Sequence, residues 1–290
     1  MKKLLLLALL LVPCVAEAQV QSKTILFIGN SFTFGAGSAA HRYQSNTVTD
    51  LNPPDAKGRT VGGVPAMFKS FTKQAGLDYE VSLETVGGKG MDFHFAEKRA
   101  LIDKPWDVVV MHGYSTLDQA KPGNPALLVT SARQMTDMFR AQNPKAEVWL
   151  TATWSRADQT YPKDKPWSGK PIQQMGKDIA GAYVLAAEGA KATGIVPAGL
   201  AWNRAFETGV ADDNPYDGIA PGKVDLWTHD SYHASAYGYY LEALLVFGKV
   251  TGKDPLSLGE TETVAEDMGF SKTQTKALQQ IAHDELAASR

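Results

Sequence analysis

The chain has 290 residues, 44% of them hydrophobic, and a formal net charge of −2. This balance is typical of a globular protein with a full hydrophobic core, and it excludes a disordered or strongly basic chain. Because no cluster of basic residues stands out, we expect no nucleic acid partner.

Residues 1–18 have the features of a secretory signal peptide. Two lysines precede an apolar run at residues 4–12, and an A-x-A cleavage site ends at Ala18. The run is too short to span a membrane and no later run reaches that length, so we expect no stable membrane anchor. We therefore predict an exported protein, periplasmic or extracellular, with a single domain at residues 19–290.

The only cysteine, Cys14, belongs to this signal segment and leaves with it. Disulfides and catalytic or metal-binding cysteines are therefore not expected in the mature chain. A lipoprotein that keeps Cys14 is the alternative, but Pro13 directly before it fits that processing poorly.

The first predicted strand leads to a candidate nucleophile. Residues 24–28 are apolar and rich in β-branched and aromatic side chains, which is typical of a buried strand. The strand ends in Gly29-Asn30-Ser31, and the glycine allows a sharp turn. A serine just past this turn would lie at the carboxyl edge of a sheet, where open α/β sheets bind their ligands. Ser31 is therefore a candidate nucleophile; the alternative is an ordinary polar turn, because Gly, Asn and Ser are common in turns.

Strands and helices alternate along the rest of the chain. Further strands are predicted at residues 79–86, 108–111, 146–153 and 194–197. Helices are predicted at residues 64–74, 93–102, 125–142, 171–192, 200–207 and 235–250, with a helical region from residue 255 onward. Polar connections are predicted at residues 35–63, 155–170 and 210–228, and we expect the first to cover the edge where Ser31 emerges. The alternation predicts an α/β fold with a five-stranded parallel sheet covered by helices on both faces.

A second polar group precedes the helix predicted at residues 235–250. Asp230 and His233 are three residues apart. On a bent loop, this spacing lets the carboxylate bind one imidazole nitrogen while the other nitrogen faces outward, as nucleophilic serine chemistry requires. The structural alternative is that Asp230 or Ser231 caps the helix and that His233 is an ordinary polar residue.

The same segment contains a rival metal motif. His229 and His233 are four residues apart, a spacing that places two zinc ligands on one face of a helix. His41, His94 or His112 would supply the third ligand. The glutamate of the His-Glu-x-x-His motif is missing, so zinc-dependent hydrolysis is kept only as an alternative.

Two more turns follow predicted strands at the same sheet edge. Gly87 and Gly88 come after the second strand, where a backbone N–H group can stabilise the oxyanion of acyl transfer. Gly113, Tyr114 and Ser115 follow the third strand. Each turn alone is also compatible with simple strand termination. Neither turn matches a phosphate loop or a dinucleotide-binding fingerprint, so no cofactor is implied.

The order of these turns resembles the SGNH (GDSL-type) hydrolase family. A Gly-x-Ser turn, a glycine turn, a polar turn and Asp-x-x-His follow one another across nearly the whole mature chain. The resemblance implies a flavodoxin-like three-layer α/β/α fold, with Ser31, His233 and Asp230 as a catalytic triad. It also implies an oxyanion hole formed by the N–H groups of Ser31 and Gly88, with Gly87 or Gly90 as the alternative to Gly88.

Two departures from the family pattern concern the site. The usual Gly-Asp-Ser is Gly-Asn-Ser here, which places Asn30 beside the nucleophile. The third turn of the family usually supplies an asparagine side chain as an oxyanion donor, but here it contains Gly113, Tyr114 and Ser115. We predict Tyr114 as the replacement donor, with His112 and Ser115 as alternatives. The α/β-hydrolase elbow G-x-S-x-G is absent as well.

Together these features predict a secreted serine esterase that hydrolyses short acyl esters, with a carbohydrate O-acetyl ester as the first expectation. The substrate would be a small molecule or a polysaccharide, and no oligomeric state is predicted. The alternatives are a non-catalytic carbohydrate-binding protein on a hydrolase fold and a zinc-dependent hydrolase. Five aromatic residues near the predicted edge are expected either to stack on sugar rings or to pack in the protein: Phe34, Trp154, Tyr161, Trp167 and Trp227.

Overall fold

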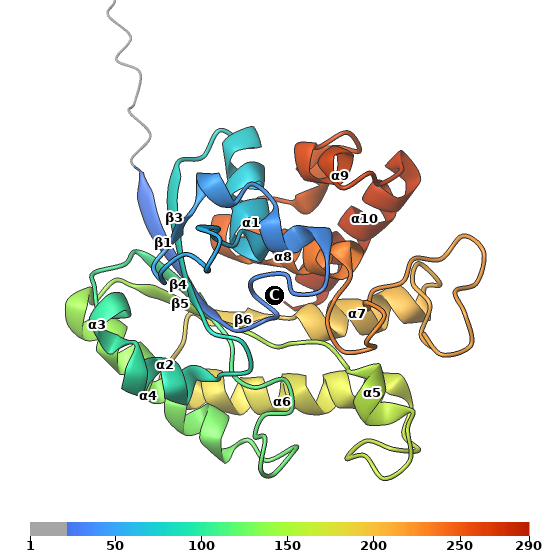
Figure 1. Cartoon of the computed structure of the whole chain (residues 1–290), viewed down its shortest axis with the longest axis horizontal. Helices are drawn as coiled ribbons and strands as arrows, with labels where there is room; N and C mark the ends of the chain where they lie inside the picture. Colours follow the sequence, from blue (N-terminus) through green and yellow to red (C-terminus); the bar gives the residue numbers. More distant parts are fainter. Residues whose placement is uncertain (1–21, 290) are drawn as a thin grey trace, which may run out of the picture.

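The computed structural model describes residues 22–289, so the predicted signal peptide lies outside the described residues. A six-stranded sheet with the order β2-β3-β1-β4-β5-β6 runs through the centre of the molecule (Figure 1). The strands are β1 (Lys23–Gly29), β2 (Thr49–Asp50), β3 (Tyr79–Thr85), β4 (Val108–Met111), β5 (Glu147–Thr151) and β6 (Gly194–Val196). All neighbouring strands are parallel, so every carboxyl end meets at one edge.

The strand order reverses at β1, which has β3 on one side and β4 on the other. In open parallel sheets, this switch point leaves a crevice beyond the carboxyl ends of the strands, where ligands bind. The residue after β1 is Asn30 and the next is Ser31. The topology therefore brings the candidate nucleophile to the favoured ligand-binding place of the fold.

The prediction of five strands was wrong by one, because β2 lies in the segment predicted as a connection. This strand is only two residues long, and Thr49 and Asp50 pair with Ser82 and Leu83 of β3. So short a strand carries no hydrophobic alternation, and its pairing with β3 decides its conformation. The other five strands were predicted within two residues at each end.

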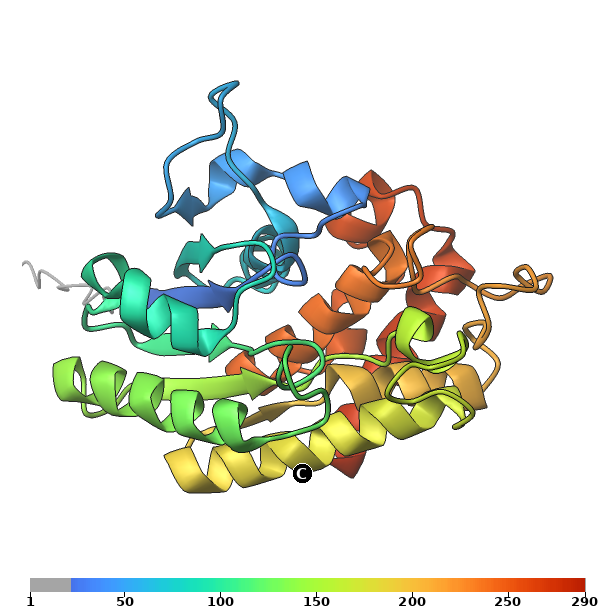
Figure 2. The ribbon, with the colours of Figure 1, turned by 60° about the horizontal axis from the view of Figure 1, so that its bottom comes forward.

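Helices cover both faces of the sheet (Figure 2). One layer consists of α1 (Gly63–Gln74), α7 (Ala198–Glu207), α8 (Ala236–Thr251) and α10 (Lys272–Ala288). The other consists of α2 (Met91–Glu97), α4 (Ala126–Gln142) and α6 (Ile172–Ala190). Short helical turns complete the described chain: η1 (Ala39–Arg42), η2 (Ser45–Thr47), α3 (Arg99–Ile102), α5 (Ala157–Thr160), η3 (Pro255–Leu258) and α9 (Thr263–Asp267). This arrangement confirms the predicted three-layer α/β/α architecture.

Two local predictions about helices need correction. The helix predicted at residues 93–102 is interrupted at Lys98, which ends α2 and begins α3. The segment predicted as a loop at residues 155–170 contains the one-turn helix α5. Both differences concern single turns, whose hydrogen bonds depend on packing more than on sequence propensity.

Strand β1 shows why the central strands are continuous apolar runs. Ile25 and Phe27 pack against the layer of α1 and α8, whereas Leu26 and Ile28 pack against the layer of α4 and α6. All four side chains are at most 1% exposed. A strand covered on both faces needs apolar residues at every position. Within residues 22–289, no helix combines the length and apolar character needed to cross a membrane.

Candidate active site

Ser31 lies in a tight turn directly beyond β1. The carbonyl of Asn30 accepts hydrogen bonds from the N–H groups of Thr33 and Phe34, at 3.0 and 3.2 Å. The Tyr239 hydroxyl of α8 donates to the Ser31 carbonyl at 3.1 Å and so holds the turn to this helix. Ser31 itself is 7% exposed. The backbone around the candidate nucleophile is therefore held at several points.

Glycine is required at position 29 because the turn packs closely on β4. A Cβ atom there would collide with Thr33 Oγ1 and with the ring of His112. The ring of His112 is fully buried, and its Nδ1 lies 2.9 Å from the Gly113 carbonyl. A carbonyl only accepts, so Nδ1 carries the proton and Nε2 accepts from the Thr33 hydroxyl at 2.7 Å. Burial lowers the pKa of His112 to about 4.

His112 is therefore a neutral structural residue, and it does not serve as the alternative oxyanion donor. Its single N–H proton is used by the Gly113 carbonyl. Protonating it near neutral pH would require charge in a site from which water is excluded.

The Asn30 side chain connects three turns at the sheet edge. Its Nδ2 donates to the carbonyls of Lys89 and Gly113, at 2.9 and 3.4 Å, and its Oδ1 accepts from the Phe32 N–H at 3.1 Å. An aspartate cannot make the first two bonds, because a carboxylate has no proton to donate to a carbonyl. The departure from the family's Gly-Asp-Ser thus has a structural reason.

His233 and Asp230 form a close pair on the loop before α8. His233 Nδ1 lies 2.6 Å from Asp230 Oδ2, and Asp230 Oδ1 accepts from the Thr228 hydroxyl and from the N–H groups of Tyr232 and His233. Burial alone would raise the pKa of Asp230, but these hydrogen bonds lower it below the usual range. Helix α8 is capped by Ser235, so the predicted alternative of a cap at Asp230 or Ser231 was wrong.

The aromatic residue next to the nucleophile joins the loop of His233 to its turn. The Phe32 ring lies 5.8 Å from the His233 ring and stacks on Trp154 at 4.1 Å. Trp154 Nε1 donates to the carbonyl of Tyr232, directly before His233. Within the described residues, His233 Nε2 has no hydrogen-bond partner. The nitrogen that a serine proton would need is therefore unoccupied by protein groups.

The glycine turn after β3 presents its backbone to the same edge. Gly88 has a φ of +69°, and a Cβ atom there would meet nothing within 4 Å. No group in residues 22–289 accepts a hydrogen bond from its N–H. At Gly90, by contrast, the Tyr114 ring fills the place of a side chain. Gly88 is thus open, as is Gly87, where a Cβ atom would meet only the Phe34 ring at 3.9 Å.

The fold is similar to the folds of two solved structures. It is similar to a DUF4886 family protein from Bacteroides uniformis, with a TM-score of 0.61 and 18% identity, covering 92% of this chain and 95% of that chain. It is also similar to a putative GDSL-like lipase from Parabacteroides merdae, with a TM-score of 0.52 and 17% identity, covering 80% and 98%. No protein-family profile and no curated protein matches the sequence.

The chain has the SGNH-type hydrolase fold. The resemblance seen in the order of the turns is confirmed at this level. At these identities the likeness establishes the fold alone, and the chemistry must be argued from the site.

The SGNH-type fold does not bring the histidines of the rival zinc motif together. His94 is buried and paired with Glu84, while His112 is bound to Thr33 and Gly113 as described above. His229 is exposed on the loop. Among residues 22–289, no three His, Cys, Asp or Glu side chains are grouped as metal ligands.

The tryptophans that were candidates for sugar stacking belong to the core. Trp154, Trp167 and Trp227 are at most 3% exposed, and Trp227 Nε1 donates to the buried carbonyl of Ser155. Of the other two aromatics, Tyr161 is 38% exposed and Phe34 is partly buried. Sequence alone does not separate these cases, because tryptophan is common both in cores and at carbohydrate sites.

Arg156 is a residue of the site region that sequence analysis missed. Its guanidinium lies over the Tyr232 ring, 3.6 Å from the ring centroid, and donates to Ser115. It sits in the segment predicted only as a polar loop, and no motif or spacing marks it. The residues it touches come from the third turn and the His233 loop, so only the fold reveals the connection.

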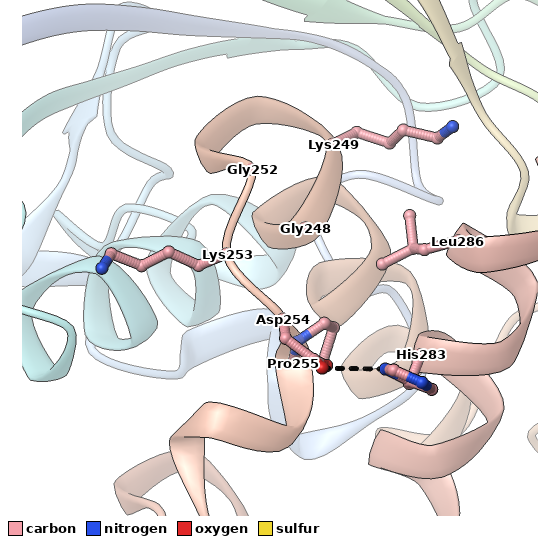
Figure 3. Close-up of a pocket in the computed structure, with 8 residues that line it drawn as sticks. All are labelled: Gly248, Lys249, Gly252, Lys253, Asp254, Pro255, His283 and Leu286. Atoms are coloured by element: carbon pink, nitrogen blue, oxygen red, sulfur yellow. Dashed lines mark hydrogen bonds and ion pairs between the residues drawn. The ribbon is translucent and has the colours of Figure 1, made fainter. Parts of the chain in front are cut away.

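A second histidine–aspartate pair lies in a hollow of about 300 Å³ far along α8 (Figure 3). His283 Nδ1 is 2.9 Å from Asp254 Oδ2. Among the described residues that line this hollow, none is a serine or a threonine. The pair therefore lacks a hydroxyl nucleophile of its own.

Proposed function

We propose that the protein is an exported serine esterase with Ser31 as nucleophile, His233 as general base and Asp230 as its orienting carboxylate. One observation carries the proposal: the Asp230–His233 pair, 2.6 Å apart, packs against the turn of Ser31 at the switch point of the sheet. The fold shared with a putative GDSL-like lipase supports this assignment. Export is inferred from the signal-peptide features of residues 1–18.

In the proposed acylation step, Ser31 Oγ attacks the ester carbonyl carbon while its proton moves to His233 Nε2. The tetrahedral intermediate then collapses, and the alcohol departs with the proton from His233. In deacylation, a water molecule attacks the acyl-enzyme and gives a proton to His233, which returns it to Ser31 Oγ. The products are the free alcohol and a carboxylic acid.

The negative oxygen of the intermediate needs hydrogen-bond donors, each worth about 3–4 kcal/mol. The N–H groups of Ser31 and Gly88 are the proposed backbone donors. The open position of Gly88 and its unused N–H support this role. Tyr114 was predicted as a third donor from the sequence, and this assignment stays a prediction.

The proposed substrate is a short acyl ester of a hydroxyl-rich alcohol, with carbohydrate O-acetyl esters first. A hollow of about 270 Å³, lined in part by Phe34 three residues beyond Ser31, supports this choice because its lining includes charged side chains of both signs. It is lined by Phe34, His41, Arg42, Asp50, Asn52, Pro53, Asp55, Arg59, Val61 and Thr85. A long lipid chain would require an apolar channel instead.

A fluorophosphonate probe tests the proposal, because it reacts covalently with activated serines. We expect one adduct on Ser31 of the mature protein, located by intact mass and peptide mapping. Ser31→Ala and His233→Ala should remain unlabelled while unfolding at about the wild-type temperature. A folded wild-type protein without an adduct would overturn the proposed function.

A further inference from the structure

Arg156 is held by partners on three sides. Its Nε and Nη2 donate to the two carboxylate oxygens of Asp158, at 2.9 and 2.6 Å. Its third nitrogen, Nη1, donates to Ser115 Oγ at 3.2 Å, and its plane lies over Tyr232. The side chain is 14% exposed. A planar guanidinium bound in this way has one orientation, which a lysine would not reproduce.

The Ser115 hydroxyl is left with a proton to donate. Ser115 is buried, at 9% exposure, and its oxygen accepts from Arg156. A hydroxyl can accept and donate at the same time. No acceptor for its proton is present among residues 22–289. The cation behind the oxygen also polarises the O–H bond, which strengthens any hydrogen bond that it donates.

Two sets of contacts connect Ser115 with the turn of the candidate nucleophile and with the loop of the candidate base. On one side, the Asn30 amide binds the third turn to the turn of Ser31. On the other side, the Tyr232 ring lies between the guanidinium and the His233 ring, whose centroid is 4.1 Å away. Ser115 is thus linked through its own turn to the Ser31 turn and through Arg156 and Tyr232 to His233.

Tyr114 packs against the glycine turn after β3. Its ring packs on Gly90, at the place where a side chain of that residue would be. Burial raises the pKa of the Tyr114 hydroxyl, and the neighbouring carboxylate of Asp92 raises it further.

We propose that Ser115 is the third oxyanion donor and that Arg156 is the residue that positions it. Ser115 occupies the third place of the Gly-x-Asn turn, where the family has asparagine, and its hydroxyl replaces the missing amide. This inference rests on the serine-esterase function proposed above, and it replaces Tyr114 in the donor role. The oxyanion would then be bound by the N–H groups of Ser31 and Gly88 and by the Ser115 hydroxyl.

Steady-state kinetics with p-nitrophenyl acetate separates the two candidate donors. Ser115→Ala should lower kcat by about 10²- to 10³-fold with little change in KM, because a donor to the oxyanion acts mainly in the transition state. Ser115→Asn, which restores an amide donor, should keep most of kcat. Tyr114→Phe is the matched control and should keep wild-type kcat. An unchanged kcat in Ser115→Ala, or the large loss in Tyr114→Phe instead, would overturn the inference.

A double-mutant cycle tests the role of Arg156. Arg156→Lys keeps the positive charge but loses the planar guanidinium with its several N–H donors, and it should lower kcat by about 10-fold. Adding it to Ser115→Ala should cause almost no further loss, since the positioned group is already gone. Full additivity of the two losses would contradict a positioning role, and equal unfolding temperatures would exclude a general loss of structure.

The fluorophosphonate probe separates failure of this inference from failure of the function. Labelling of Ser31 in wild type, together with wild-type turnover by Ser115→Ala, overturns the inference alone. If the wild-type protein shows no labelling and no turnover, the proposed function is overturned, and the inference falls with it.

Discussion

The two histidine–aspartate pairs of this protein flank the same helix but have different surroundings. His233 and Asp230 precede α8, whereas Asp254 follows it and pairs with His283 of α10. The nitrogen–oxygen distances are similar, 2.6 and 2.9 Å. The first histidine is 17% exposed and packs against the nucleophile turn, while the second is 36% exposed.

This comparison indicates that a histidine–aspartate pair alone does not form an active site. Asp230 accepts two backbone N–H bonds and one hydroxyl bond in addition to the imidazole, so its charge and orientation are fixed. Asp254 caps the short helix η3, and its side chain is 43% exposed. An exposed pair contributes about 0–1 kcal/mol to stability. Only the first pair has a serine-bearing turn at the carboxyl edge of the sheet next to it.

The largest expected effect separates the two histidines. His233→Ala should lower kcat for p-nitrophenyl acetate by up to about 10⁶-fold, since no other base can take the serine proton. His283→Ala should leave kcat unchanged and shift the free energy of unfolding by less than about 1 kcal/mol. Comparable losses in both variants would mean that the second pair takes part in the chemistry.

A smaller effect is expected at the carboxylates. Asp230→Asn should lower kcat by about 10⁴-fold, because the amide favours the wrong tautomer of His233. Asp254→Asn is the matched control and should retain wild-type kcat. Thermal unfolding would show whether both proteins fold. If Asp230→Asn kept full activity, the orienting role of this carboxylate would be refuted.

The next effect concerns Asn30, in the turn that carries Ser31. Asn30→Asp should lower kcat by about 10²-fold, because a carboxylate cannot donate to the carbonyls of Lys89 and Gly113 and the turns would separate. Asn143→Asp is a control at a residue of the same type at the end of α4, where Nδ2 donates to the Trp106 carbonyl and Oδ1 accepts from the Lys145 N–H. Retained kcat in Asn30→Asp would show that the amide does not position the site.

A substitution within α8 should leave activity unchanged and alter only the pH dependence of stability. Glu242 is fully buried there, and burial raises its pKa to about 8. The folded-state pKa is above the unfolded value, so this carboxyl's contribution is complete below about pH 4 and is lost as pH rises toward 8. The free energy of unfolding should therefore fall by roughly 1.4 kcal/mol per pH unit between about pH 5 and 8 from this group.

Glu242→Gln should remove that slope and raise stability at pH 8, with kcat unchanged. Urea unfolding at several pH values measures it, and Glu266→Gln, at an exposed position, provides the control. An unchanged slope in Glu242→Gln would show that the carboxyl does not titrate in this range.

Much of the fold could be predicted from the chain alone. Five strands were located because continuous apolar runs such as residues 108–111 are covered on both faces. The turn of Ser31 and the spacing of Asp230 and His233 were visible because each lies within a few residues. The third donor was left open within one turn: Tyr114 was predicted, with His112 and Ser115 as alternatives, and our proposal of Ser115 rests on its contact with Arg156.

The sequence by itself determined the local features of this protein: apolar runs, glycine turns and closely spaced polar groups, whose physical basis is a few neighbouring residues. Only the tertiary structure decided which distant groups meet. It paired β2 with β3, buried His112 and three tryptophans, and stacked Arg156 on Tyr232. These contacts depend on how whole layers pack, and no short stretch of sequence carries that information.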